Sequence, residues 1–211
     1  MSTTIPGVTI LIPDGVITDA TIGSQAAIAT SKLAQQPLQV FPVKLTDARV
    51  HDAIATVLSG TPASDDLGLV GGTFGTDSPM LSAGDLKAAG ATTRRARLLL
   101  PVPANYQDGE TIQLRLRCAV ETTVADTSCT VDVEVFKGDG TGAVGSDLCT
   151  TAAQTINSLT PANVDFTILA SGVDPGDLLD VRLSIACTDA ATGTAVTPVI
   201  YSVTLLCDTR G

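Results

Sequence analysis

The chain has 211 residues, a formal net charge of −10, 44% hydrophobic residues and only 3% aromatic residues. The acidity argues against nucleic acid as a partner, because phosphate binding requires a basic face. The scarcity of aromatic rings counts against a carbohydrate-binding platform and against a base-stacking surface, which both rely on such rings. We expect neither a membrane span nor a secretory signal, because no long apolar run and no basic N-terminal region followed by one is present.

Residues 1–45 carry charges that cancel and apolar side chains at irregular spacing. Ile17, Ile22 and Ile28 are separated by five and six positions, which fits neither a helix nor a strand. We predict an extended arm that becomes ordered on a partner and places separate anchors in separate pockets. The expected partner-binding anchors are Ile10, Ile12, Ile17, Ile22, Ile28, Leu33, Leu38 and Phe41.

Residues 46–93 are expected to form a collar of loops around one short helix. In LTDARVHDAIATVLSG, Thr46 can cap the helix, and Leu45 and Val50 have the spacing of a hydrophobic staple. Val50, Ile54, Val57 and Leu58 form one apolar stripe, and Gly60 ends it. A less regular strand is expected within residues 67–74.

Residues 94–211 show the alternation that is typical of half-buried antiparallel strands. In TIQLRLRCAV, the residues Ile112, Leu114, Leu116, Cys118 and Val120 form one apolar row. Similar rows occur at 131–135, 179–187 and 199–207, the last consisting of Val199, Tyr201, Val203, Leu205 and Cys207, and less regular strands are expected at 96–102 and 164–169. Asp174-Pro175-Gly176-Asp177 has the composition of a type II turn. The chain is therefore expected to be mainly β, an antiparallel, jelly-roll-like β-sandwich with an irregular N-terminal arm and one short helix.

The five cysteines show no CxxC motif and no Cys/His cluster, and His51 is the single histidine. We therefore expect no metal site and no cofactor. Cys118, Cys187 and Cys207 share parity with buried residues, which predicts free thiols in a protein made in a reducing cytosol. Cys129 and Cys149 are the candidates for a disulfide.

No group of side chains forms a recognisable catalytic motif. His51 lacks a nucleophile motif and is expected to be a surface or cap-proximal histidine. Turn chemistry explains the acidic sets Asp65-Asp66 and Asp174/Asp177/Asp180 better than a glycosidase pair does. The loop GDGTGAVGSD, with Asp139 and Asp147, lacks the spacing of a calcium-binding EF-hand, and Gly71-Gly72 is no phosphate loop.

Three arginines, Arg115, Arg117 and Arg182, lie on the outward rows of their predicted strands. Asp132 and Glu134 form an acidic row on another strand. We expect the two sets to pair across the sheet, with a role in an interface as the alternative.

The phrase DGVITDATIGSQAAIATSKLAQQ resembles segments of head and fibre proteins of tailed bacteriophages. The run VKLTDARVHDAIATVLSGTPASDDLGLVGGTFGTDSP, with the closing strands, resembles capsid decoration (cement) proteins of these phages. The resemblance covers most of the chain in layout and phrase. It implies a non-enzymatic virion protein on the exterior of the capsid, made in the bacterial cytoplasm. It also implies a homotrimer whose arms bind the major capsid protein and clamp neighbouring capsomers. The organisation expected is an arm (1–45), a collar (46–93) and a β-sandwich domain (94–211).

Three alternatives remain open at this point. A phage head- or tail-fibre adaptor shares the leader phrase, although long fibres usually contain repeats, which this chain lacks. A β-sandwich enzyme that degrades polysaccharides would require a carboxylate pair in a cleft, with Asp174 and Asp177 as the candidates. A cell-surface adhesin module is disfavoured by the expected absence of a secretion signal.

Overall fold

The computed structural model describes residues 35–63, 65–138, 142–191 and 193–210. The chain divides into two units, Met1–Leu33 and Ala34–Gly211, and the described residues all belong to the second. Six of the predicted arm anchors, Ile10, Ile12, Ile17, Ile22, Ile28 and Leu33, lie outside the described residues. The predicted division into arm, collar and β-domain therefore stays a prediction.

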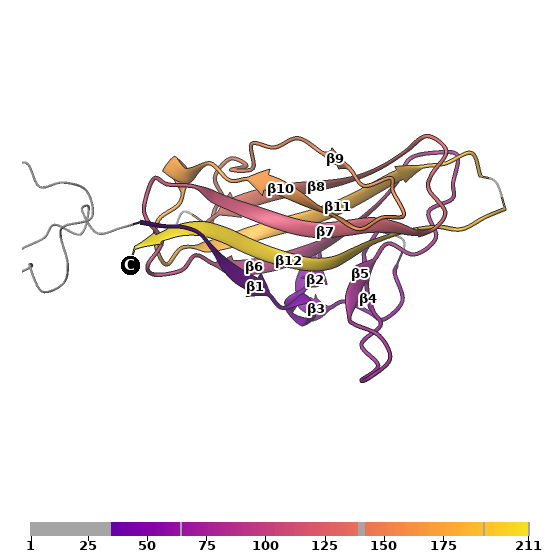
Figure 1. Cartoon of the computed structure of the whole chain (residues 1–211), viewed down its shortest axis with the longest axis horizontal. Coiled ribbons are helices and arrows are strands. Elements are labelled where there is room, and N and C mark those ends of the chain that lie inside the picture. Colours follow the sequence, from indigo (N-terminus) through magenta and orange to yellow (C-terminus); the bar gives the residue numbers. More distant parts are fainter. Residues whose placement is uncertain (1–34, 64, 139–141, 192, 211) are drawn as a thin grey trace, which may run out of the picture. The chain divides into compact units, whose positions relative to one another are not determined.

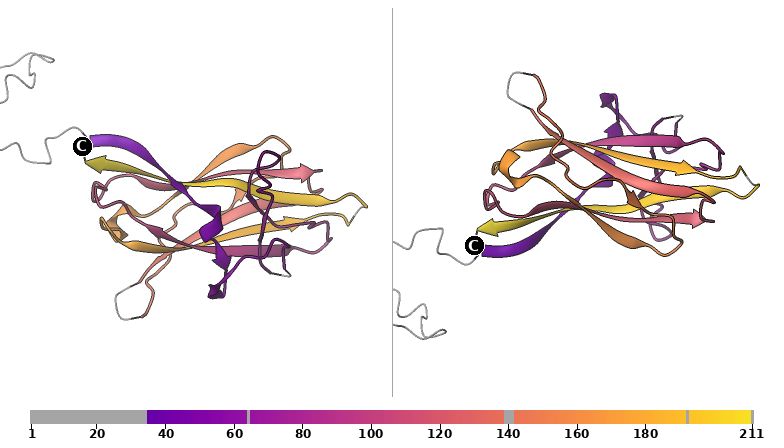
Figure 2. Two further views of the ribbon diagram at one scale, coloured as in Figure 1. Left: turned by 90° about the horizontal axis from the view of Figure 1, so that it is seen from below. Right: turned by 90° about the horizontal axis from the view of Figure 1, so that it is seen from above.

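Two antiparallel sheets face each other as the layers of a sandwich (Figures 1 and 2). Sheet A contains β10 (Ala162–Thr167), β7 (Ile112–Thr122), β12 (Val196–Arg210), β5 (Met80–Ser82) and β4 (Gly68–Val70), in that order, with β1 (Gln35–Val43) also paired to β12. Sheet B contains β3 (Ala53–Val57), β2 (Arg49–Val50), β6 (Thr92–Pro101), β11 (Leu178–Thr188), β8 (Ser128–Lys137) and β9 (Gln154–Thr155), in that order. Two short 3-10 turns, η3 (Leu45–Asp47) and η4 (Ala170–Gly172), complete the elements. The predicted mainly β, antiparallel sandwich is confirmed.

The core lies between the sheets and consists of the apolar rows that the alternation predicts. On β7, Ile112, Leu114 and Leu116 are inaccessible to solvent, and their neighbours Gln113 and Arg115 are half-buried. The facing rows on β8 and β11 are equally buried, namely Val131, Val133, Val135, Leu179, Val181, Leu183 and Ile185. Because successive side chains of a strand point to opposite faces, this pattern leaves the polar rows on the two outer faces.

A β-bulge in β12 corrects the row predicted for residues 199–207. The pairing of β12 with β7 shifts between Ile200 and Ser202. An extra residue in one strand reverses the parity of the side chains beyond it. Val203, Leu205 and Cys207 therefore join the core cluster as predicted, and in the first half of the strand Ile200 joins it instead of Val199 and Tyr201. Val199 is nevertheless fully buried, as predicted, whereas Tyr201 is only half-buried.

The predicted helix after Leu45 is wrong. Residues 45–57 form η3, β2 and β3, and Lys44 at the N-cap of η3 makes no side-chain capping bond. Arg49 lies opposite Arg97 of β6, so β2 extends sheet B by one more strand. Of the stripe read as helical, Val50, Ile54 and Val57 are β-branched residues that fit a strand better than a helix. Pairing with the edge of β6 outweighed the local capping signals.

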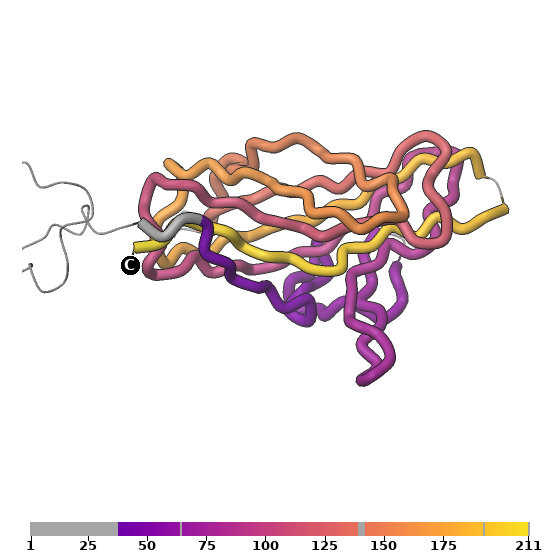
Figure 3. Tube along the Cα trace, in the orientation of Figure 1, coloured from indigo at the N-terminus to yellow at the C-terminus, as the bar shows by residue number. Residues whose placement is uncertain are grey.

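Strand β1 places Leu38 and Phe41, the two predicted anchors among the described residues, along β12. Phe41 lies opposite Leu205 and packs against the core. Leu38 is partly exposed at a bulge, with a φ of 44°, and its N–H donates to Asp208 Oδ1 at 2.7 Å. Figure 3 follows this chain segment to the short elements around β2 and β3.

The turn predicted at residues 174–177 is confirmed. Gly176 has a φ of 86°, and the N–H of Asp177 donates to the carbonyl of Asp174 at 3.1 Å. A positive φ at the third position is what a type II turn requires and what glycine adopts without strain. The turn leads directly into β11.

Candidate functional site

The outer face of sheet B carries a charged array on its three central strands, which we call the polar face. It consists of Arg95 and Arg97 on β6, Asp180 and Arg182 on β11, and Asp132 and Glu134 on β8. The strand register sets Arg182 opposite both Arg97 and Glu134. All six side chains are half-buried, because each lies among neighbours on the adjacent strands.

Two ion pairs organise the polar face. Arg97 Nε donates to Asp180 Oδ1 at 2.6 Å, and Arg97 Nη2 donates to Asp180 Oδ2. The hydrogen bond to Asp180 is the main reason that the pKa of Arg97 is raised. Arg182 donates through Nε to Glu134, as predicted. Each pair fixes the plane of a guanidinium, which carries five N–H donors in all.

The other outward arginines behave differently from the prediction. Arg115 lies on sheet A and donates to Asp165 of β10 at 2.6 and 2.7 Å, rather than to the acidic row of β8. Arg117 is exposed on the same strand. Arg115 and Arg117 lie on sheet A, whereas the acidic row of β8 lies on sheet B. Alternation within a single strand does not reveal which sheet that strand joins.

A groove of about 240 Å³ opens on the polar face. Its lining consists of His51, Arg97, Phe136, Val144, Asp180 and Arg182. Phe136 follows the acidic row on β8 and lies opposite Asp180, so an aromatic ring borders the two ion pairs. The groove thus combines one apolar wall with planar hydrogen-bonding groups in fixed positions.

His51 is held by a carboxylate fifteen residues further along the chain. Its Nδ1 lies 2.9 Å from Asp66 Oδ1, and its backbone N–H donates to the same oxygen at 3.2 Å. Both side chains are about 15% exposed, so the expected surface position is only partly correct. The pair fixes the imidazole at the edge of the groove, where it can exchange a hydrogen bond with a ligand. Sequence analysis did not identify Asp66 as the partner of His51, because Asp52 is the carboxylate next to His51 along the chain.

The remaining acidic candidates have structural roles. Asp174 and Asp177, expected as turn residues, both bind Lys137 Nζ, at 2.7 and 2.6 Å. Their hydrogen bonds, with that of Asp174 the larger, raise the pKa of Lys137. Asp147 Oδ1 accepts from the N–H groups of Val135 and Cys149, while Asp139 lies outside the described residues.

The described residues contain neither a metal-binding cluster nor a helix that could span a membrane. No three His, Cys, Asp or Glu side chains among them come together in a group that could hold a metal ion. Within the same residues, no helix has the length and apolar character needed to cross a membrane.

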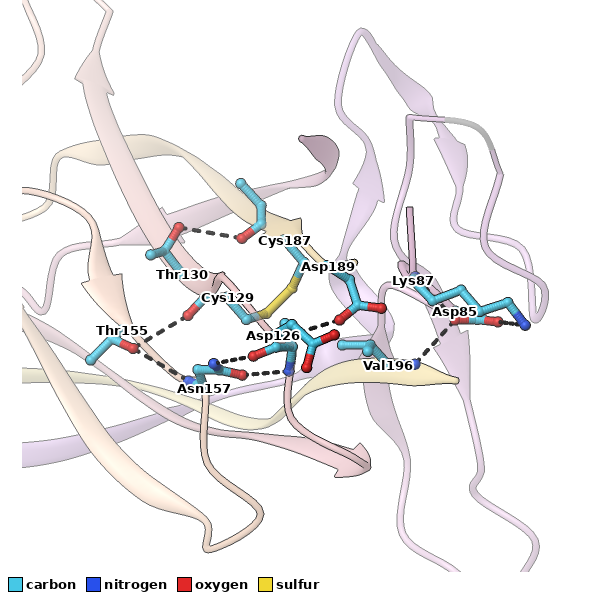
Figure 4. Close-up of a disulfide and its surroundings, with 12 residues drawn as sticks. Asp85, Lys87, Asp126, Cys129, Thr130, Thr155, Asn157, Cys187, Asp189 and Val196 are labelled. Carbon is cyan, nitrogen blue, oxygen red and sulfur yellow. Dashed lines mark hydrogen bonds and ion pairs between the residues drawn. A yellow bond between two sulfur atoms is a disulfide. The ribbon is translucent and has the colours of Figure 1, made fainter. Parts of the chain in front are cut away.

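The cysteines pair differently from the prediction. Cys129 on β8 and Cys187 on β11 form a disulfide, with Cα atoms 4.2 Å apart (Figure 4). They lie directly opposite each other in the strand register. Cys187 is therefore not a free thiol, and Cys149 is not the partner of Cys129. Cys118 and Cys207 are buried free thiols, as predicted, and the thiol of Cys149 is partly buried.

Short polar contacts close the end of the sandwich next to the disulfide (Figure 4). The side chain of Asn157 exchanges two hydrogen bonds of 2.8 Å with the backbone of Ala125. Buried Asp189 accepts from the N–H of Asp126 at 2.9 Å. Asp85 accepts from the N–H of Val196, at the start of β12, at 3.1 Å. These contacts fix loops to strands and leave the polar face as the stronger candidate for binding.

Searches with protein-family models and of curated proteins found no match to the chain. Solved structures do resemble it. A xylan-binding module named CBM15 is 14% identical with a TM-score of 0.44, covering 82% of this chain and 99% of its own. A module specific for non-crystalline cellulose, CBM28, is 12% identical with a TM-score of 0.40, covering 67% and 81%. The CBM22-1 xylan-binding domain of Paenibacillus barcinonensis Xyn10C is 11% identical with a TM-score of 0.38, covering 69% and 82%.

The comparison with carbohydrate-binding modules contradicts the capsid-decoration function, which we therefore withdraw. At these identities the likeness concerns the β-sandwich fold and assigns no ligand to this chain. The homotrimer, the capsid partner and the location on a virion followed from the same resemblance, and neither the structure nor the comparisons test them.

Proposed function

We propose that the chain is a non-enzymatic module that binds a neutral polysaccharide on the polar face of sheet B. The observation that carries this proposal is the groove itself, in which the Phe136 ring borders the Arg97–Asp180 and Arg182–Glu134 pairs. A sugar ring offers apolar C–H faces and a rim of hydroxyl groups, so it matches a surface that combines an aromatic ring with paired donors and acceptors.

The charge of the polar face supports a neutral ligand. Its three arginines, at 95, 97 and 182, balance its three carboxylates, at 132, 134 and 180, although the whole chain carries a net charge of −10. A phosphate-rich or strongly acidic ligand would meet no excess of positive charge there. Hydroxyl groups require only donors and acceptors, which a balanced array supplies.

The size of the groove supports a weak contact with one part of a longer chain. Small-molecule pockets usually measure roughly 300–1,000 Å³, and this groove is smaller, at about 240 Å³. With one aromatic ring in its lining, we expect a dissociation constant on the order of 0.1–1 mM. The Cys129–Cys187 disulfide also supports the proposal. Disulfides persist in oxidising surroundings such as the outside of cells, where a polysaccharide-binding module would meet its ligand.

The test uses soluble xylan and non-crystalline cellulose, the ligands that the names of the similar structures suggest. Isothermal titration with xylan oligosaccharides and sedimentation with cellulose should both detect binding by the full chain. Phe136→Ala should weaken it at least tenfold, because the apolar wall of the groove is lost. Absence of binding to both polysaccharides would refute this choice of ligand and remove the support for the proposal.

A matched pair of arginine variants locates the site. Arg182→Gln removes a guanidinium from the groove, and Arg115→Gln removes one from a similar ion pair on sheet A. We expect the first variant to lose affinity and the second to bind as the original chain does. Equal affinity in both variants would exclude the polar face as the site.

The same samples test an enzymatic function in which His51 and Asp66 would act, since Asp174 and Asp177, the carboxylates first considered for that alternative, both bind Lys137. The reducing ends released from xylan are counted over a day of incubation with the full chain and with His51→Gln. We expect no release by either protein. Release that His51→Gln abolishes would replace the binding module with a polysaccharide-degrading enzyme that uses the His51–Asp66 pair.

A further inference from the structure

The imidazole of His51 has one nitrogen held by the protein and one accessible to solvent. His51 occupies the turn between β2 and β3 and lines the groove of the polar face. Its Nδ1 lies 2.9 Å from Asp66 Oδ1. Its Nε2 makes no hydrogen bond with the described residues, and it is not one of the buried polar atoms that lack a partner there. Nε2 is therefore accessible, on a ring that forms part of the groove wall.

Backbone hydrogen bonds on either side of Asp66 hold this carboxylate to sheet B. Asp66 bridges β6 at Arg95. The N–H of Arg95 donates to the carbonyl of Asp65 at 2.8 Å, and the N–H of Leu67 donates to the carbonyl of Arg95 at 2.8 Å. Asp66 Oδ1 also accepts from the backbone N–H of His51, at 3.2 Å. The ring and the carboxylate therefore keep their relative positions without a ligand.

The partner of Nδ1 determines which nitrogen carries the hydrogen in the neutral ring. An ionised carboxylate only accepts hydrogen bonds, so Nδ1 is the donor and Nε2 carries the lone pair. Within the lining of the groove, the side chains of Arg97 and Arg182 supply only donors. Both oxygens of Asp180, the other side-chain acceptor in that lining, already accept from Arg97. His51 Nε2 is thus the side-chain acceptor of the groove to which no described residue donates.

We propose that His51 Nε2 accepts a hydrogen bond from a sugar hydroxyl and so selects polysaccharides in which this hydroxyl is unsubstituted. This selectivity rests on the proposed function, because it concerns the ligand of the same groove. A hydroxyl donates one hydrogen and accepts others, so one group can donate to Nε2 while it accepts from the guanidinium of Arg97 or Arg182. An acetylated oxygen has no hydrogen to donate, and it leaves Nε2 facing the ligand without a donor. Chains with free hydroxyls should therefore bind more tightly than acetylated chains.

The same nitrogen makes binding sensitive to pH. Protonation places a hydrogen on Nε2, so the acceptor becomes a donor and the sugar hydroxyl loses its partner. Asp66 accepts from Nδ1 in both states, which keeps the ring in place. The charged groups around the imidazole are Asp52 on its own turn, Asp65 and Asp66, Arg95 and Arg97 on β6, Asp180 and Arg182 on β11, and Glu134 on β8. Protonation adds one positive charge to this set, to which a neutral sugar is indifferent. The affinity should therefore fall with pH through the lost hydrogen bond, roughly threefold to tenfold.

Nuclear magnetic resonance locates the hydrogen without any ligand. His51 is the single histidine, so an untagged chain with isotope-labelled histidine gives the spectrum of one imidazole. Its nitrogen–hydrogen couplings at about pH 8 should be those of the tautomer with the hydrogen on Nδ1. Asp66→Ala removes the carboxylate and should raise the share of the other tautomer. A hydrogen on Nε2 in the neutral ring of the original chain overturns the proposal, whatever the ligand.

Isothermal titration with unsubstituted xylan oligosaccharides between about pH 8 and pH 5.5 tests the acceptor. The affinity of the original chain should fall roughly threefold to tenfold over this range. His51→Gln offers an amide oxygen that gains no proton, so its affinity should stay constant with pH. His51→Phe keeps a ring without nitrogen, so at the highest pH it should bind as weakly as the original chain does at the lowest. Asp52→Asn, which changes the exposed carboxylate beside His51, should behave as the original chain does.

Fully acetylated xylan oligosaccharides test the selectivity itself. An acetyl group also adds bulk, so the quantity compared is the ratio of the two affinities, unsubstituted over acetylated, in each variant. If bulk alone caused the discrimination, His51→Phe would leave this ratio unchanged. We expect His51→Phe to lower the ratio at least about threefold near pH 8, and His51→Gln to preserve it.

Three results would overturn the selectivity while binding itself persists. They are an equal pH dependence in the original chain and His51→Gln, a normal affinity of His51→Phe at the highest pH, and an unchanged ratio in His51→Phe. Each of them leaves the proposed function intact. If no chain binds xylan oligosaccharides or cellulose at any pH, the proposed function is refuted and the selectivity is refuted with it.

Discussion

Tyr106 is a fully buried ring whose hydroxyl has a backbone partner. It donates to the carbonyl of Glu110 at 2.6 Å. Burial, followed by the nearby charge of Asp108, raises the pKa of Tyr106 to about 12. The hydroxyl therefore stays protonated at physiological pH and fixes the turn before β7 rather than acting as an acid or base.

The number of reactive thiols is a direct test of the Cys129–Cys187 disulfide. Burial raises the pKa of Cys118 to about 12 and that of Cys207 to about 11, and burial also raises the pKa of Cys149. Because the thiolate is the reactive form, the native protein should expose at most the partly buried Cys149 to a thiol reagent at pH 8. Unfolding without reductant should give three reactive thiols, and unfolding with reductant should give five. Five thiols without reductant would show that Cys129 and Cys187 are not paired.

Asp85 should make stability depend on pH. Desolvation raises its pKa, but the hydrogen bonds from Val196 and Lys87 outweigh that effect and lower the pKa below 3.8. Since the folded pKa lies below the unfolded one, the contribution is fully present above about pH 4 and is lost as pH falls through the folded pKa. The side chain of Asp85 is 37% exposed, so water screens these interactions, and Asp85→Asn should lower the free energy of unfolding by no more than about 0.5 kcal/mol at pH 7, and by less at pH 3.

Urea unfolding at both pH values measures this difference. The matched control is Asp52→Asn, which changes an exposed carboxylate and should leave the curve unchanged. A constant difference between the original chain and Asp85→Asn from pH 7 to pH 3 would contradict the assignment.

At the scale of elements, strands were predicted well where one face is buried. The rows of β7, β8 and β11 alternate over many residues, and their partners in the sheet follow the same period. The short strands β2 and β3 were missed because a capping residue and an apolar stripe also fit a helix. In such a short segment, pairing with a neighbouring strand decides between helix and strand, and local preference does not. Here the neighbour is β6, which pairs with β2 at Arg97.

Strand β1 lies within residues 1–45, the predicted arm, and nevertheless belongs to sheet A of the sandwich. It pairs with the C-terminal half of β12, with Val43 opposite Val203 and Phe41 opposite Leu205. Deleting residues 1–33 should leave the thermal midpoint within about 2 °C, because no element of sheets A and B is removed. Deleting residues 1–43 should lower it by roughly 5–15 °C, because β12 loses its partner on one edge while keeping β7 on the other, and apolar side chains are exposed.

Circular dichroism melts of the two deletions and the full chain provide the measurement. The shorter deletion is the control for the longer one. Equal midpoints for both deletions would mean that β1 contributes little to the stability of sheet A.

At the scale of the whole molecule, a net charge of −10 surrounds a polar face whose own charges balance. Binding of neutral xylan should therefore change less than twofold between about 0.05 and 0.5 M salt, since salt screens net charges over a Debye length of roughly 4–14 Å in this range. Titrations at three salt concentrations check this expectation. A steep loss of affinity with salt would point to a charged ligand and against the neutral polysaccharide.

The sequence by itself determined the fold class, because alternation with period two can be satisfied only by strands that bury one face. It also determined the type II turn at Asp174–Asp177, whose geometry depends on the local residues Pro175 and Gly176. Tertiary structure alone decided the Cys129–Cys187 pair, the His51–Asp66 pair and the bulge in β12. Each of these depends on which distant strands or loops become neighbours, and that choice is made by the packing of the two sheets. The polar face arises in the same way, from residues of β6, β11 and β8 that approach only when these strands pair in sheet B.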